Sequence, residues 1–247
     1  MKLLIDFGNS RCKWALLNDQ AFLESKAYFY KSEDLTQRAH EIAEQICFDS
    51  IKQIHAVNVL GNGFEQVFRA QANTRAKIDI KFHVSLLNSH GVMLAYANPL
   101  SYGADRYAAL IAAHHKTSGA KIIIDCGTAT TVDGIEASGK HLGGLIIPGI
   151  ELMCSALANK ASGISMPQQM NSTQLFNDNT AEAVYSGSAL VLSHGVRGIV
   201  QEIMSKINLQ ATVYVTGGQN KMIDLAGIEH VDCPNLVLEG LRILQGK

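Results

Sequence analysis

The sequence predicts an α/β protein built from two related lobes. A short apolar run that ends in Asp-x-Gly occurs twice, as Asp6-x-Gly8 and as Asp125-x-Gly127. The two copies lie 119 positions apart (125 minus 6), which is nearly half of the 247 residues. Segments with the patterns of strands and helices follow each copy. A repeat at this spacing indicates a duplicated structural unit, with a boundary near residues 115–121.

The first half is expected to begin with strands and to continue with alternating helices and strands. Residues 3–6 are a short apolar run that ends in Asp6 and is followed by Gly8-Asn9, a pattern typical of a buried strand and its turn. Residues 33–46 have apolar side chains at helical spacing, and Ser32 is expected to cap that helix. The expected strands are 3–6, 13–17, 27–30, 53–60 and 78–84; the expected helices are 33–46, 64–72 and 103–115.

The second half repeats this opening. Residues 121–125 form an apolar run ending in aspartate, and two further strands follow at 130–135 and 142–147. Helices are expected from residue 150, over 181–204 and over 236–244, with a strand at 212–216 before Gly217-Gly218. Glycine and serine recur in the segment 181–204, which we interpret as a core helix or a dimer-interface helix.

Composition excludes several classes of protein. Basic and acidic residues number 21 and 22, so a large basic face for nucleic acid is not expected. No apolar run approaches the roughly 18 residues of a membrane span, and the first residues lack a signal-peptide pattern. The five cysteines include no C-x-x-C pair, which favours free thiols. We therefore expect a cytoplasmic protein with no nucleic-acid or membrane partner.

The two Asp-x-Gly turns carry the strongest chemical signal. A carboxylate at the end of a buried strand is costly unless it is paired or holds a cation. Glycine lets the backbone turn tightly and approach a ligand. Either turn alone is more simply interpreted as a hairpin turn. Two copies at matching places predict a cleft with a carboxylate on each side, suited to a metal–nucleotide complex.

Four motifs in register extend this pattern over most of the chain. They are Asp6-Phe7-Gly8-Asn9-Ser10, Gly103-Ala104-Asp105-Arg106, the segment from Asp125 to Asp133, and the segment from Gly143 to Gly149. Together they resemble type III pantothenate kinases, with one departure, since Ser10 stands where that family usually has threonine. The resemblance implies two duplicated ribonuclease-H-like lobes with a central cleft, as in actin-like ATPases. The expected lobes are residues 1–117 and 118–247.

The resemblance also implies an activity and its cofactors. The expected reaction is ATP-dependent phosphorylation of pantothenate to 4′-phosphopantothenate, the first step of coenzyme A biosynthesis. It would require Mg²⁺ and a monovalent cation, either K⁺ or NH₄⁺, in a homodimer. The alternatives are another small-molecule kinase of the same superfamily and a non-enzymatic regulator built on the same scaffold.

By the same resemblance Asp105 is the general base that accepts the proton of the pantothenate hydroxyl. Spacing alone favours a helix-capping role for this aspartate. The residues implied to bind pantothenate are Tyr96, Gly103, Ala104, Asp105, Arg106 and Thr180. Thr180 also precedes a long helical segment, where it is a natural cap.

The remaining implied roles concern the nucleotide and the cations. The residues implied to bind ATP are Asp6, Phe7, Gly8, Asn9, Ser10, Arg11, Cys12, Lys13 and Thr128. Asp6 would also face Mg²⁺, and Asp125 would hold the monovalent cation. Composition and spacing do not separate that role of Asp125 from a second Mg²⁺ contact. The alternation of Lys13 with apolar neighbours is equally consistent with a side chain that faces solvent.

Overall fold

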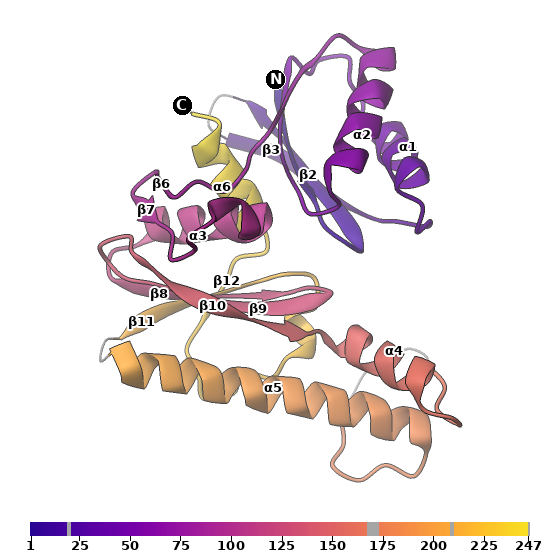
Figure 1. The fold of residues 1–247 in the computed structure, drawn as a ribbon, viewed down its shortest axis with the longest axis vertical. Coiled ribbons are helices and arrows are strands. Elements are labelled where there is room, and N and C mark those ends of the chain that lie inside the picture. The colour runs from indigo at the N-terminus through magenta and orange to yellow at the C-terminus, as the bar shows by residue number, and fades with distance from the viewer. Residues whose placement is uncertain (19–20, 167–172, 208–209, 247) are drawn as a thin grey trace. The chain divides into compact units, whose positions relative to one another are not determined.

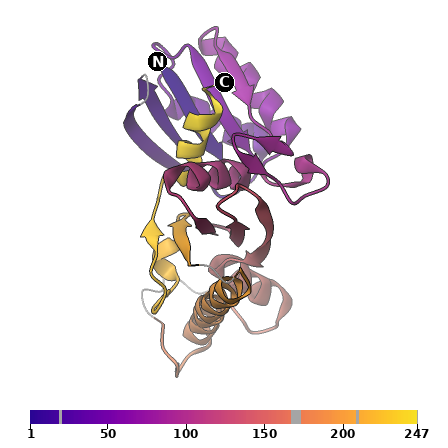
Figure 2. The same ribbon diagram turned by 90° about the vertical axis from the view of Figure 1, so that its left-hand side faces the viewer.

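The computed structural model describes residues 1–18, 21–166, 173–207 and 210–246. The chain forms two compact units (Figures 1 and 2). The first comprises Met1–Lys116 together with Asn235–Lys247, and the second comprises Thr117–Pro234. Among the described residues, no helix has both the length and the apolar character that crossing a membrane requires.

The first unit contains a five-stranded mixed sheet in the order β3-β2-β1-β4-β5. The strands are β1 (Lys2–Phe7), β2 (Arg11–Asn18), β3 (Ala21–Phe29), β4 (Gln53–Asn58) and β5 (Asp79–Phe82). β1, β2 and β3 pair antiparallel, whereas β1, β4 and β5 pair parallel. Parallel neighbours need a crossover connection, and helices α1 (Leu35–Gln45) and α2 (Asn62–Arg75) supply the two crossovers.

The two faces of this sheet are covered by different helices. Alternate residues of β1, namely Leu3, Ile5 and Phe7, lie in a core that also contains apolar residues of α1 and α2. Helices α3 (Ala104–Lys116) and α6 (Leu236–Leu244) contact each other, and α6 also contacts β1 and β4 (Figure 1). A loop with the short strands β6 (Asn88–Ser89) and β7 (Val92–Met93) and the 3-10 turn η1 (Pro99–Ser101) precedes α3.

The second unit repeats the sheet, in the order β10-β9-β8-β11-β12. Its strands are β8 (Ala120–Cys126), β9 (Ala129–Ile135), β10 (His141–Pro148), β11 (Ala211–Thr216) and β12 (Val231–Asp232). The antiparallel and parallel pairs follow the same order as in the first unit. Helices α4 (Ile150–Lys160) and α5 (Thr180–Ile207) share a core with β8, β9 and β11.

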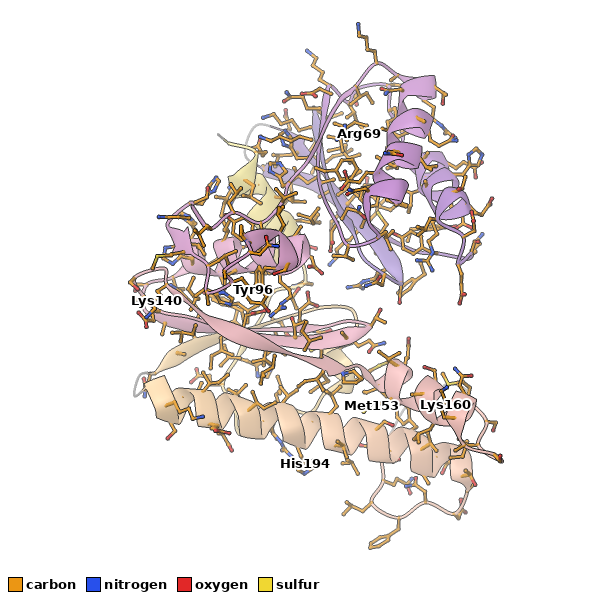
Figure 3. All side chains as sticks on the ribbon, viewed as in Figure 1. Arg69, Tyr96, Lys140, Met153, Lys160 and His194 are labelled. Carbon is orange, nitrogen blue, oxygen red and sulfur yellow. The ribbon has the colours of Figure 1, made fainter. Side chains whose placement is uncertain are left out.

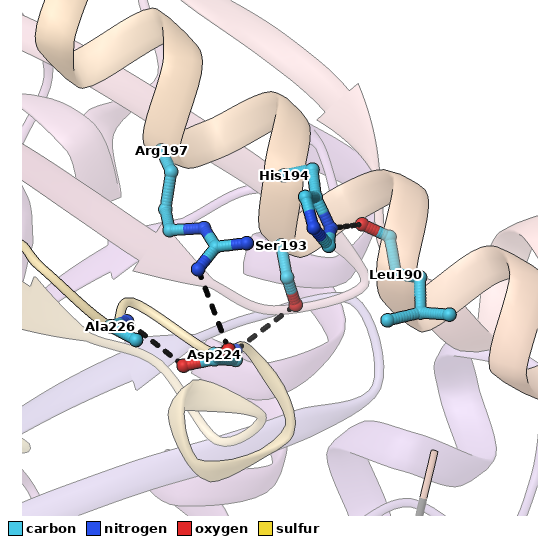
Figure 4. Close-up of polar contacts among 6 residues, drawn as sticks. All are labelled: Leu190, Ser193, His194, Arg197, Asp224 and Ala226. Carbon is cyan, nitrogen blue, oxygen red and sulfur yellow. Dashed lines mark hydrogen bonds and ion pairs between the residues drawn. The ribbon is translucent and has the colours of Figure 1, made fainter. Parts of the chain in front are cut away.

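Helix α5 also holds the loop that follows β11 and the 3-10 turn η2 (Asn220–Met222) (Figure 4). Ser193 Oγ accepts a hydrogen bond of 3.0 Å from the Asp224 N–H, and Arg197 forms an ion pair of 3.6 Å with the Asp224 carboxylate. The other Asp224 carboxylate oxygen accepts from the Ala226 N–H at 2.8 Å. These contacts fix the loop that leads to β12.

The structure differs from the expected elements in several details. The residue that caps α1 is Asp34, whose carboxylate accepts from the Gln37 N–H at 2.8 Å, and Ser32 instead accepts from the Asp34 N–H. The expected cap of α5 is likewise displaced by one residue. Asn179 Oδ1 accepts from the Glu182 N–H at 2.9 Å, and Thr180 is the first helical residue.

The last helix lies in a different unit from the one expected. A linear division assigns residues 118–247 to the second lobe, whereas contacts group Asn235–Lys247 with the first unit. The reason is the packing of α6: Leu236, Leu238 and Leu241 are fully buried, and α6 contacts α3.

Candidate active site

The first candidate element is the turn between β1 and β2. The Gly8 N–H donates to the Arg11 carbonyl at 3.1 Å and closes the turn, while Asn9 and Ser10 at its tip are exposed. Across the antiparallel ladder, Asp6 lies directly opposite Lys13. Cross-strand partners project from the same face, so the Asp6 carboxylate and the Lys13 ammonium are neighbours. This register gives Lys13 a specific place beside the predicted site.

Phe7 and Cys12 of the same turn project from the opposite face. Both are completely buried, and the Phe7 ring packs against the rings of Phe64 and Phe68, with centroids 4.9 and 4.8 Å away. Burial, together with the Asp6 charge, raises the pKa of the Cys12 thiol well above its ordinary value. Any contact of these two residues with a nucleotide would therefore use the backbone rather than the side chain.

Two residues that the motif search did not single out support this turn by donating hydrogen bonds to its carbonyl groups. Arg38 Nη1 donates to the Asn9 carbonyl at 2.8 Å, and the Tyr30 N–H donates to the Ser10 carbonyl at 3.2 Å. The Arg38 guanidinium also lies over the Tyr30 ring, 4.8 Å from its centroid. Both carbonyls at the tip of the turn are thus engaged by donors from the same unit.

The second candidate element is the start of α3. Asp105 stands in the first turn of this helix, and its Oδ1 accepts from the Arg106 N–H at 2.7 Å. A Cβ atom at Gly103 would lie 2.6 Å from Asp105 Oδ1, so a larger residue at position 103 would shift the carboxylate from this position. The half-buried carboxylate is therefore held at a helix N-terminus, where a negative charge is favoured.

Arg106 and Tyr96 are linked through a residue that sequence reasoning missed, Tyr102. The Arg106 guanidinium lies over the Tyr102 ring at 4.6 Å, and the Tyr96 and Tyr102 ring centroids are 4.9 Å apart. Figure 3 shows Tyr96 in the loop before α3. Arg106 is 7% exposed, which is unusual for a cation. The aromatic residue directly before Gly103 was the available signal for Tyr102.

The third candidate element is the turn between β8 and β9. The Gly127 N–H donates to the Ala129 carbonyl at 3.1 Å, and the Gly149 N–H donates to the Thr128 carbonyl at 2.9 Å. A Cβ atom at Gly149 would lie 2.7 Å from the Thr128 carbonyl oxygen, and one at Gly217 would overlap the Cys126 backbone. Gly217 also has φ +95°, a conformation that favours glycine. Backbone packs on backbone around this turn.

Asp125, the next-to-last residue of β8, lies within a row of oxygen-bearing side chains. Its register partners are Thr131 on β9 and Thr216 on β11. Partners in register share a face, so a carboxylate and two hydroxyls gather at one end of the sheet. Burial raises the pKa of the adjacent Cys126 thiol to about 12, and the charges of Asp125 and Asp232 add to the effect. Oxygen atoms are the ligands that hard cations prefer.

The structure therefore brings the predicted residues together in three groups, one on each of these elements. Thr180 belongs to none of them by the described contacts: it is exposed at the start of α5. The described residues contain no cluster of three or more histidine, cysteine, aspartate or glutamate side chains suited to a metal ion.

Comparisons with known proteins add independent findings. Residues 2–202 match the model of a family described as type III pantothenate kinase. A type III pantothenate kinase of Janthinobacterium sp. (strain Marseille) is 33% identical over 251 residues, covering 98% of this chain and 96% of its own. That of Herminiimonas arsenicoxydans is 32% identical over 248 residues, with the same two coverages.

Solved structures resemble the fold at lower identity. A Baf family protein from Campylobacter jejuni aligns with TM-score 0.60 and 19% identity, over 98% of this chain and 96% of its own. MreB5 of Spiroplasma citri bound to ADP aligns with TM-score 0.51 and 9% identity, over 99% and 95%. EutJ of Carboxydothermus hydrogenoformans gives TM-score 0.56 and 15% identity, over 98% and 88%. The predicted α/β fold with two sheet-based, actin-like lobes is confirmed.

Proposed function

The chain belongs to the type III pantothenate kinase family, and we propose that it phosphorylates pantothenate to 4′-phosphopantothenate at the expense of ATP. This is the first step of coenzyme A biosynthesis. The observation that carries the proposal is the match of residues 2–202 to the family, which includes all three groups of candidate residues. Other small-molecule kinases and regulators share the fold, so the fold alone does not select this reaction.

Asp105 is the residue we assign as general base. Its carboxylate would accept the proton of the primary hydroxyl as that oxygen attacks the γ-phosphorus, and ADP would leave. Helix α3 and Gly103 support this role because they hold the carboxylate at the helix start. A base must be positioned before its pKa matters, and phosphoryl transfer depends chiefly on position and charge.

Arg106 is the residue we assign to the carboxylate of pantothenate. Its guanidinium lies over the Tyr102 ring, 4.6 Å from the ring centroid, and a planar guanidinium binds a carboxylate through two parallel hydrogen bonds. Tyr96, Gly103 and Ala104 would line the same substrate site, and Thr180 would contribute from α5. Pantothenate carries both a hydroxyl and a carboxylate. Its binding site therefore needs a base beside the hydroxyl and a cation beside the carboxylate.

The turn from Asp6 to Lys13 would hold the phosphates of ATP, through the N–H groups at its tip, Ser10 and the Lys13 ammonium. Thr128 would contact the nucleotide from the other turn. Mg²⁺ would take Asp6 with phosphate and water oxygens, since this ion commonly binds through only one or two carboxylates. When bound, Mg²⁺ neutralises the charge that develops on the transferred phosphoryl group.

Asp125 is the residue we assign to the monovalent cation. The hydroxyls of Thr131 and Thr216 beside it fit an oxygen-ligated ion. We further propose a homodimer, for which α5 is the candidate interface helix. Its exposed Val191 and its three glycines with open space around them, Gly187, Gly195 and Gly198, are consistent with a packing surface.

The direct test is incubation of the pure protein with ATP, Mg²⁺, K⁺ and pantothenate, followed by mass spectrometry. We expect 4′-phosphopantothenate and ADP in equal amounts. Other hydroxy acids and sugars are tested in parallel reactions, and phosphorylation of one of them instead of pantothenate identifies a different small-molecule kinase. If no product forms with either K⁺ or NH₄⁺, the proposal that the protein is an enzyme is rejected.

Asp105→Asn tests the base directly. Loss of the base is expected to lower kcat by about 10²- to 10⁴-fold while ATP binding persists. The exposed Asp49→Asn serves as the matched control, and its kcat should equal that of the wild type. Substantial turnover by Asp105→Asn removes this residue from the role of base.

A further inference from the structure

The last helix crosses α3 at a glycine. A Cβ atom at Gly240 would overlap the carbonyl group of Ala108 and would lie 2.9 Å from its Cα. Figures 1 and 2 both show α6 lying against α3 within the first unit. The obstacle is backbone rather than a flexible side chain, so any larger residue at position 240 must displace one helix from the other. The separation of the two helices is thus set by the absence of a side chain at Gly240.

Helix α6 is also fixed on either side of this crossing. The Glu239 carboxylate forms an ion pair of 2.5 Å with the Lys116 ammonium at the end of α3. Gln245, just beyond α6, accepts a hydrogen bond from the Lys2 ammonium on β1. Between these contacts, Leu238 and Leu241 are completely buried. A helix that is packed and tethered in this way cannot yield easily, so strain introduced at the crossing would pass to α3.

Asp105 lies three residues before Ala108, within one turn of the same helix. A displacement of α3 at Ala108 therefore moves Asp105 and Arg106 together. We propose that Gly240 is a positioning residue, which sets the placement of α3 and so the placement of the proposed base and the proposed carboxylate-binding cation. This inference rests on the proposed function. Gly240 itself lies outside residues 2–202, which match the family model.

The test is Gly240→Ala, with Gly63→Ala as the matched control. Gly63 is a helical glycine of the same unit, and nothing lies within 4 Å of its added Cβ. At a temperature well below melting, we expect Gly240→Ala to lower kcat by about tenfold to a hundredfold, as a displacement near 1 Å does. The KM for pantothenate should rise, the KM for ATP should change little, and Gly63→Ala should match the wild type.

A merely structural role predicts a different pattern. Gly240→Ala would then lower the melting temperature while kcat and both KM values stay unchanged, and that result overturns the inference. If Gly240→Ala does not fold, Glu239→Gln provides the second variant, because it removes the ion pair with Lys116 and keeps the side-chain size. We expect about a twofold to threefold fall in kcat/KM for pantothenate. An unchanged value in that folded variant also overturns the inference.

The wild type separates this inference from the function on which it rests. An inactive wild type rejects the pantothenate kinase assignment, and the inference falls with it. An active wild type whose Gly240→Ala and Glu239→Gln variants are folded and fully active rejects the inference alone.

Discussion

The two units share one sheet topology but hold their Asp-x-Gly turns by different means. In the first unit, Arg38 and the Tyr30 backbone support the turn at its exposed tip. In the second, Gly149 and Gly217 pack directly on the backbone of the turn. The duplicated turn therefore has an adaptable support in one unit and a rigid one in the other.

The carboxylates of the two turns also have different neighbours. Asp6 lies opposite Lys13 in the first unit, whereas Asp125 lies between Thr131 and Thr216 in the second. An ammonium neighbour compensates a carboxylate and suits the binding of phosphates. A carboxylate beside two hydroxyls offers the oxygen ligands that a hard cation prefers. One duplicated motif can therefore support two separate proposed roles, phosphate binding and cation binding, because its neighbours differ.

Substitution of a glycine in the first turn and of one that packs against the second is the most severe way to break this comparison. Gly217→Ala places a Cβ atom on the Cys126 backbone at φ +95°, and we expect a loss of about 3 kcal/mol or more in unfolding free energy. Gly8→Ala brings its Cβ atom only to 3.0 Å from the Arg11 carbonyl, and we expect a loss of about 1 kcal/mol. Urea unfolding measures both.

Gly63→Ala in α2 is the control for these two variants, since nothing lies within 4 Å of its added Cβ. Its unfolding free energy should not fall. Equal losses for Gly217→Ala and Gly8→Ala would contradict the contrast between a rigid and an adaptable turn.

Substitution of the two aspartates sharpens the contrast in chemistry. In the kinase assay, Asp125→Asn should raise the K⁺ concentration for half-maximal activity by about tenfold or more, because the balancing charge is lost. Asp6→Asn should instead raise the Mg²⁺ concentration required, by a similar factor. Titration of each variant with each salt measures the four values. The assignment of the two carboxylates is wrong if both variants respond to the same ion.

The last prediction concerns the buried histidines. In the first unit, His55 Nδ1 and His83 Nε2 lie 3.0 Å apart, and burial lowers the pKa of each imidazole to about 4. The charges of Lys2 and Lys81 lower the pKa of His55 further, and Asp79 opposes them. The charges of His55, Lys81 and His90 lower the pKa of His83 further. In the second unit, the buried His141 instead contacts the Asp133 carboxylate at 3.2 Å.

The sign of the pH effect follows from the direction of the shift. Unfolded histidines bind protons below pH 6.5, whereas the folded pair stays neutral down to about pH 4, so stability falls as the pH drops through this window. The slope is at most about 1.4 kcal/mol per pH unit for each histidine. His83→Gln should flatten this decline in urea unfolding, and the exposed His40→Gln should not. A decline that is as steep in His83→Gln as in the wild type would exclude the pair as its cause.

Much of the first turn and of the positions of the longer strands was predictable because local pattern determines them. An apolar run that ends in Asp-x-Gly specifies a strand and a tight turn, and its recurrence at residue 125 specified the second copy. The short strands β6, β7 and β12 were not predictable, since two-residue strands carry no periodic pattern. Tyr102, Arg38 and Tyr30 were missed for a related reason. Each supports the site by contacting residues that lie elsewhere in the sequence, and no periodic pattern marks these contacts.

By itself, the sequence determined the duplicated α/β fold, the family and the three segments that carry the candidate site. It could do so because periodicity, turn residues and motif spacing are local properties of the chain. Only the tertiary structure decided which side chains share a face, such as Asp6 with Lys13 and Asp125 with its threonines. It also decided that the last helix returns to the first unit, where Gly240 meets Ala108. That choice depends on close packing between segments more than 120 residues apart, which no local pattern records.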